Sequence, residues 1–120
     1  MHAEQEYVAP QNLSERVSDA APQELVAMLL EGAAGFTDRV VDAIQQRDAG
    51  EKLRLVGRVS AIIEQLVTML NYEDGGALVD NLARIYEWWL HELFEASAEE
   101  STLRLQRISS QMGSLKESWN

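Results

Sequence analysis

After Pro22 the chain contains no proline, which leaves nearly its whole length free to form helix. Val, Ile and Thr nowhere alternate with polar residues for long enough to indicate a strand. Apolar residues instead recur every three or four positions, which is typical of amphipathic helices. The sequence therefore predicts an all-α protein.

Four amphipathic segments carry this periodicity, and short polar connections separate them. Because a short connection leaves no room for the chain to cross the bundle, consecutive helices become antiparallel neighbours. We expect an antiparallel up-down four-helix bundle over residues 19–120, preceded by a mobile N-terminal segment, residues 1–18, in which Asn12 to Val17 can form one short helix. The four predicted helices begin at Asp19 to Pro22, near Glu51, at Gly76 and after a capping Ser97; the first ends at Asp48 to Gly50, and the third ends at Ala96.

Each predicted helix has one apolar stripe that should face the core. The stripes are Leu25, Leu29, Ala33, Phe36, Val40 and Ile44; then Val56, Val59, Ile63, Leu66 and Leu70; then Leu78, Leu82, Ile85, Trp89 and Leu93; and finally Leu105, Ile108, Met112, Leu115 and Trp119.

Two helices carry more apolar residues than one stripe uses. The second has a further seam of Leu55, Ile62 and Met69, and the third has Tyr86, Trp88, Leu90 and Phe94 on its flanks. Trp88 points about 100° away from Trp89, so a single seam cannot bury both. Trp88 therefore either packs under the N-terminal segment or is exposed on a binding face. Spare apolar surface on a small protein favours a partner-binding function.

Composition narrows the choice of partner. The formal net charge of −10 repels phosphate backbones and anionic lipid, so we expect neither nucleic-acid binding nor membrane insertion. The longest wholly apolar run, Leu25 to Leu30, is far shorter than the about 20 residues that span a bilayer. The acidic start has no signal-peptide pattern, and the absence of cysteine fits a reducing cytoplasm.

Catalysis and metal binding find little support in the sequence. A carboxylate-bridged di-iron site needs Glu-x-x-His pairs from two helices, but the only histidines are His2 and His91. Glu87 and His91 are spaced for a shared ligand face, yet no second such pair exists, which favours a surface pair. Phosphate-binding and nucleophile-elbow motifs do not occur. We expect no enzyme and no cofactor, with a metal enzyme on a ferritin-like bundle as the least favoured hypothesis.

Three segments form a recognisable pattern in their order and spacing. They are Ala21-Pro22-Gln23-Glu24-Leu25 with Met28-Leu29 and Gly32-Ala33; Glu73-Asp74-Gly75-Gly76 with Asn81-Leu82 and Tyr86; and Trp119 near the end of the last helix. With Tyr7 near the N-terminus, this pattern resembles the flagellin-specific export chaperone family FliS. The chain departs from the family pattern at Leu30 and Glu87-Trp88-Trp89, and at Leu90-His91-Glu92, where a basic pair is common.

The resemblance implies a cytoplasmic protein that binds the disordered C-terminal region of flagellin, prevents premature polymerisation and delivers it to the flagellar export apparatus. In several members the N-terminal segment covers part of the client groove when no client is bound. The residues expected to contact the partner are Tyr7, Ile62, Met69, Asn81, Leu82, Ile85, Tyr86 and Trp89. For Ile62, Leu82 and Trp89 an ordinary core role competes with this one, and Tyr7 could equally be a disordered tail residue. The alternative function is a homodimeric bundle, an adaptor for another protein, whose spare seam pairs with a second copy.

Overall fold

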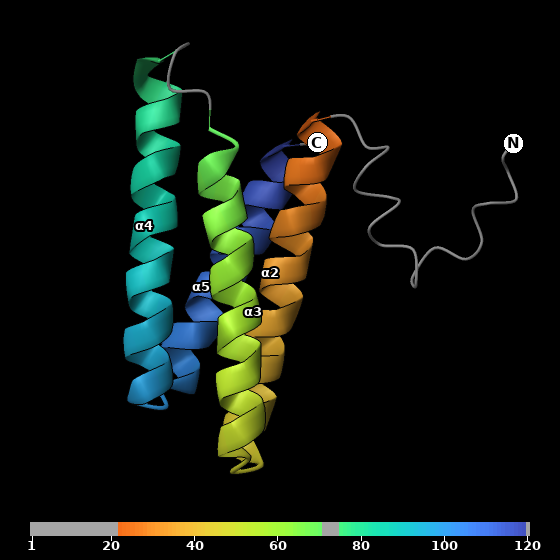
Figure 1. Cartoon of the computed structure of the whole chain (residues 1–120), viewed down its shortest axis with the longest axis vertical. Helices are drawn as coiled ribbons and strands as arrows, with labels where there is room; N and C mark the ends of the chain where they lie inside the picture. The colour runs from red at the N-terminus through yellow and green to blue at the C-terminus, as the bar shows by residue number, and fades with distance from the viewer. Residues whose placement is uncertain (1–21, 71–74, 120) are drawn as a thin grey trace, which may run out of the picture.

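The computed structural model describes residues 22–70 and 75–119, and Tyr7 and the expected short helix at 12–17 lie outside these residues. Four α-helices and no strands occur in the described ranges. Figure 1 shows consecutive helices side by side and running in opposite directions. The predicted all-α bundle is therefore confirmed, with helices α2 (Pro22–Gln45), α3 (Ala49–Thr68), α4 (Gly76–Ala98) and α5 (Thr102–Trp119).

The α2–α3 and α4–α5 turns have the same backbone conformation and hydrogen-bond pattern. Arg47 and Glu100 both adopt the left-handed conformation, with φ of 59° and 57°. The amide that follows each of these residues donates back to a carbonyl of the last helical turn, Asp48 N to Ala43 O and Ser101 N to Ala96 O, each at 2.9 Å. This is the Schellman pattern, which satisfies the last carbonyls of a helix. Both helices thus end sharply at the same end of the bundle.

The start of the last helix differs from the prediction. Ser97, expected as its cap, is buried near the end of α4. The hydroxyl of Ser101 instead accepts a hydrogen bond from Arg104 N at 3.3 Å. The reason is that α4 continues to Ala98, because Leu93 and Ala96 still face the core there.

Helix α2 is the centre of the packing. It packs extensively on both α3 and α5, whereas α4 packs less extensively on α3 and α5. The buried hydrophobic residues form one continuous core. The largest fully buried side chains are Trp89, Tyr86, Leu30, Leu55, Ile63, Leu66, Leu93, Leu105, Ile108 and Met112.

The buried face of α2 is turned relative to the predicted stripe. Leu30 and Thr37 are fully buried, while Leu29 and Phe36 are only partly buried, at the edge of the core. Because α2 packs between two helices, the centre of its buried face points between α3 and α5. Thr37 is accommodated there because its hydroxyl donates to Ala33 O, four residues earlier, at 2.7 Å.

The predicted core face of α4 is wrong at its N-terminal end. Leu78 is 66 % exposed and Ile85 is 37 % exposed, although both continue the apolar stripe. Tyr86, predicted on the flank, is fully buried. The physical reason is visible in Figure 1, where the C-terminal part of α5 lies beside α2 and away from the first turns of α4. Among the described residues, α5 therefore does not cover the first turns of α4, where Leu78 is exposed.

Candidate functional site

Three of the expected partner-binding residues form part of the core. Leu82, Tyr86 and Trp89 are all buried, as the core alternative for Leu82 and Trp89 requires. The indole Nε1 of Trp89 donates to Gln111 Oε1 on α5 at 2.9 Å. The rings of Tyr86 and Trp89 lie 5.8 Å apart at a tilt of 44°. These aromatic residues anchor α4 and present no free surface in this structure.

Burial also changes the acidity of the Tyr86 phenol. Desolvation raises the pKa of Tyr86 from 10.0 to about 12, because the phenolate loses hydration in the core. The phenol is therefore neutral throughout the physiological range.

The exposed residues of α4 form a second face. Asn81 and Ile85, both expected in the site, share this face with Leu78 and Trp88, which is 44 % exposed. We call these four residues the α4 stripe; their spacing of three, four and three positions places them on one side of the helix. Asn81 Oδ1 accepts a hydrogen bond from Arg84 Nη2 at 2.8 Å. Trp88 is therefore exposed with respect to the described residues, and its alternative of packing under the N-terminal segment lies outside them.

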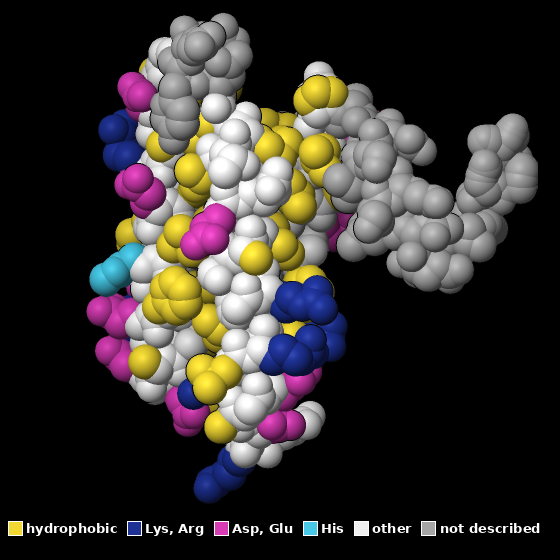
Figure 2. Space-filling model, viewed as in Figure 1, with side chains coloured by type: hydrophobic (Ala, Val, Ile, Leu, Met, Phe, Trp, Pro, Cys, Tyr) yellow, Lys and Arg dark blue, Asp and Glu magenta, His cyan; other side chains and the backbone are white. Residues whose placement is uncertain are grey.

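The expected residues on α3 lie on a different surface. Ile62 and Met69 are partly buried and seven positions apart, so they share one flank of α3. This flank faces α2, since a Cβ on Gly32 would lie 3.6 Å from Ile62 Cδ1. Figure 2 shows hydrophobic side chains along the boundary between α2 and α3. The structure therefore does not bring Ile62 and Met69 together with the α4 stripe in one groove.

An ion-pair network fixes the other end of α4. Arg104 of α5 contacts the carboxylates of Glu92 and Glu95 on α4 and of Glu99, the C-cap residue of that helix. Hydrogen bonds from Arg104 hold the pKa of Glu92 below its usual range, against the opposing effect of burial. Lys52 of α3 donates to Ser97 O at 3.2 Å and to Glu100 Oε2 at 3.0 Å. The C-terminal half of α4 is thereby tied to both of its neighbours.

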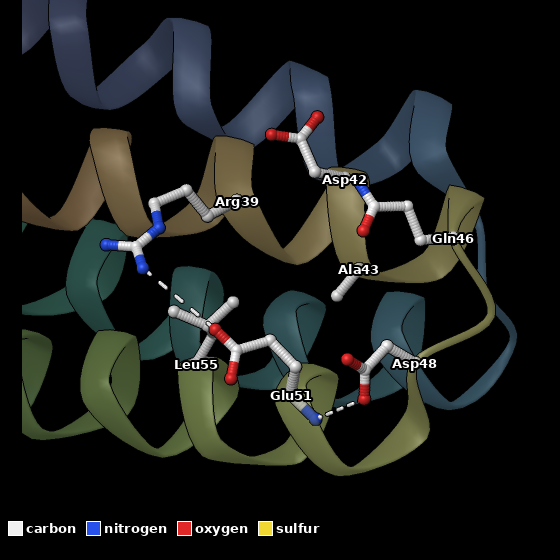
Figure 3. Close-up of a pocket in the computed structure, with 7 residues that line it drawn as sticks. All are labelled: Arg39, Asp42, Ala43, Gln46, Asp48, Glu51 and Leu55. Carbon is white, nitrogen blue, oxygen red and sulfur yellow. Dashed lines mark hydrogen bonds and ion pairs between the residues drawn. The ribbon is translucent and has the colours of Figure 1, made fainter.

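Sites for small ligands or metals are poorly developed in the described part of the chain. Figure 3 shows a pocket between α2 and α3 in which Arg39 points toward Glu51 and Asp42 points away; Ala43, Gln46, Asp48 and Leu55 complete its lining. Within residues 22–70 and 75–119, no cluster of three or more His, Asp or Glu side chains is arranged to hold a metal. The exposed His91 lies 3.6 Å from Glu95. No helix among these residues is long and apolar enough to cross a membrane.

Comparison with known proteins gives a consistent result. The family described as flagellar protein FliS matches residues 3–120. The flagellar secretion chaperone FliSB of Pseudomonas aeruginosa is 31% identical over 109 residues, which cover 91% of this chain and 86% of that protein. The flagellar secretion chaperone FliS of Campylobacter jejuni is 31% identical over 99 residues, covering 82% of this chain and 77% of that protein. The protein of the same name in Salmonella typhimurium is 25% identical over 104 residues, covering 86% and 77%.

Proposed function

Because the chain belongs to the flagellar protein FliS family, we propose that it is a flagellar export chaperone whose client is the C-terminal region of flagellin. It binds this disordered region in the cytoplasm, prevents premature polymerisation and hands the client to the flagellar export apparatus. The observation that carries the proposal is the α4 stripe, where Leu78, Ile85 and Trp88 expose large apolar groups on an acidic chain. A client that folds on binding can bury this surface by laying an amphipathic helix along it.

The burial of Tyr86 and Trp89 divides the expected contact residues into two roles. Leu82, Tyr86 and Trp89 position α4, while Asn81 and Ile85, with Leu78 and Trp88, contact the client directly. Ile62 and Met69 provide a separate contact surface near α2. A client long enough to reach both surfaces would wrap around the bundle, and the connection between them would pass over α3.

The test is calorimetric titration of the full chain with a peptide from the C-terminal region of the cognate flagellin. We expect stoichiometric binding with a large negative heat-capacity change, the signature of apolar burial coupled to client folding. Trp88→Ala and Ile85→Ala should each weaken binding roughly tenfold, the effect expected of a large side chain that carries much of the binding energy of an interface. Leu103→Ala is the matched control, since Leu103 is 63 % exposed on α5 at the opposite end of the bundle.

Equal affinities for Trp88→Ala, Ile85→Ala and the unaltered chain would remove the α4 stripe from the client site. Absence of binding by the full chain calls for the same titration with residues 1–11 deleted, since the N-terminal segment covers the groove in several family members. If the shortened chain also fails to bind, the flagellin proposal is wrong.

A homodimer is the second candidate, because a second copy could also cover the α4 stripe. Sedimentation of the full chain and of Trp88→Ala at micromolar concentration separates the two. A dimer that Trp88→Ala dissociates, together with absence of flagellin binding, would favour self-association as the function of this surface.

A further inference from the structure

Basic residues are scarce in this chain, and two of them meet around one aromatic ring. There are only 10 Lys and Arg residues against 20 Asp and Glu. Figure 2 shows a group of Lys and Arg side chains over α2 and α3, immediately below the hydrophobic boundary between these helices. Arg39 of α2 and Arg58 of α3 meet here around the ring of Phe36. Solubility alone does not explain why two arginines of an acidic protein meet around one phenylalanine ring.

The phenylalanine and the two arginines form an ordered unit. The guanidinium carbon of Arg39 lies 5.4 Å from the centre of the Phe36 ring, and that of Arg58 lies 5.7 Å from it. Phe36 is partly buried and packs against the core, so the ring is held in place. Both distances are within the range of cation–π attraction, which restrains long arginine side chains before any ligand arrives. We call Phe36, Arg39 and Arg58 the arginine–phenylalanine cluster.

Ion pairs within the described residues engage only part of the cluster. Glu51 pairs with Arg39, but it is already engaged by Arg54, which donates from Nε at 2.9 Å and from Nη2 at 2.7 Å. Arg39 Nη2 lies 3.9 Å from the same carboxylate. Arg58 forms no ion pair or hydrogen bond with the described residues. The guanidinium groups of Arg39 and Arg54 therefore share the Glu51 carboxylate, and the donors of Arg58 remain available.

We propose that the arginine–phenylalanine cluster binds an acidic segment of a partner protein, in which a glutamate or aspartate adjoins a large apolar side chain. The carboxylate accepts hydrogen bonds from Arg58, which can present two parallel donors to it. The apolar side chain covers the Phe36 ring. A protein carboxylate fits better than a nucleic acid, because a net charge of −10 repels an extended phosphate backbone.

The arginine–phenylalanine cluster is separate from the α4 stripe that we propose as a client site. The cluster lies on α2 and α3, whereas the stripe lies on α4, a helix that has no extensive contact with α2. A partner can therefore occupy the cluster while a client occupies α4. Arg58→Gln should leave binding of the flagellin peptide to α4 unchanged, so this inference and the proposed function fail separately.

The test is a titration of the full, isotope-labelled chain by nuclear magnetic resonance with two synthetic peptides. The first is a short helical peptide with glutamates and leucines at helical spacing, and the second has glutamine in place of every glutamate. We expect the glutamate peptide to shift the signals of the Phe36 ring and the Arg58 side chain, with an affinity that falls as salt is added. The glutamine peptide should leave these signals in place.

Variants locate the interaction on the cluster. Arg58→Gln should weaken binding of the glutamate peptide roughly tenfold, the equivalent of one charge-assisted hydrogen bond. Arg58→Lys should restore only part of the affinity, because lysine keeps the charge but loses the paired donors. Arg107→Gln, an exposed arginine on α5, is the control and should bind normally.

Three outcomes would overturn the proposal. The first is absence of shifts at Phe36 and Arg58 with the glutamate peptide. The second is equal binding of both peptides, which would assign the surface to apolar contact alone. The third is displacement of the glutamate peptide from these residues by a short single-stranded RNA at lower concentration, which would assign the cluster to phosphate recognition.

Discussion

Arg104 on α5 donates to both carboxylate oxygens of Glu92 on α4, from Nε to Oε2 at 2.8 Å and from Nη2 to Oε1 at 2.7 Å. The paired geometry matches the fork of a guanidinium to the two oxygens of a carboxylate. Glu92 is buried although it is charged, and Arg104 also reaches Glu95 and Glu99. The pair therefore joins α4 and α5 at a fixed register.

Glu92→Gln should lower the free energy of unfolding by about 1 kcal/mol, the contribution of a charge-assisted hydrogen bond reduced for partial exposure. Because the pKa of Glu92 is lowered in the folded state, this contribution is complete above the ordinary glutamate value of 4.5. It is lost as the pH falls through the lowered pKa. Urea unfolding at neutral and acidic pH measures both effects. Glu99→Gln is the control, because the Glu99 side chain is 60% exposed and should matter less.

Tyr86→Phe should remove one source of alkaline instability. The pKa of Tyr86 rises from 10.0 to about 12 on folding, so the unfolded chain releases this proton first as the pH increases. Stability linked to Tyr86 is complete below pH 10 and is lost between pH 10 and about 12, by up to about 1.4 kcal/mol per pH unit. Denaturant unfolding of both proteins across this range should show a shallower decline for Tyr86→Phe. Parallel declines would mean that the phenol ionises without penalty.

The adjacent tryptophans should respond differently to truncation. Trp89→Ala removes a fully buried ring and its bond to Gln111, and should cost about 3–5 kcal/mol of folding stability. Trp88→Ala should change stability by less than about 0.5 kcal/mol, because the side chain is exposed. Urea unfolding followed by circular dichroism checks both. Similar losses would show that Trp88 packs against part of the chain outside the described residues.

Two glycines offer another matched comparison. Gly75 has φ of 61° and ψ of −157°, a backbone conformation almost restricted to glycine, so Gly75→Ala should cost about 1–3 kcal/mol. Gly57 lies inside α3, and a methyl group added there would have no other atom within 4 Å, so Gly57→Ala should stabilise the protein by about 0.5–1 kcal/mol. Thermal unfolding of the two variants should therefore shift in opposite directions. A gain in stability for Gly75→Ala would contradict the observed conformation.

Helical periodicity was sufficient to predict the bundle, because each stripe records which side of a helix must leave water. Periodicity could not predict how deeply each side chain is buried. Tyr86 and Ile85 are neighbours on α4, yet Tyr86 is fully buried and Ile85 is exposed. That difference depends on where α5 lies relative to α4, which the pattern of a single helix does not contain.

The candidate surfaces were only partly predictable for the same reason. Asn81 and Ile85 were expected in the site and are exposed, whereas Leu78 was assigned to the core. The arginine–phenylalanine cluster had no clear sequence signal, since Phe36 and Arg58 are distant in sequence and meet only when α2 packs on α3. The excess of apolar groups on α4, like the further seam on α3, was the sequence feature that indicated spare apolar surface.

The attachment of α4 is unequal along its length. Arg104 and Lys52 hold its C-terminal half to α5 and α3, while its first turns carry exposed Leu78 and begin after Gly75, whose φ is positive. The polar contacts that attach α4 to its neighbours are thus gathered in one half of the helix. A ligand on the α4 stripe would therefore contact the part of the helix that carries the fewest of these polar attachments, while the core around Trp89 lies beneath it.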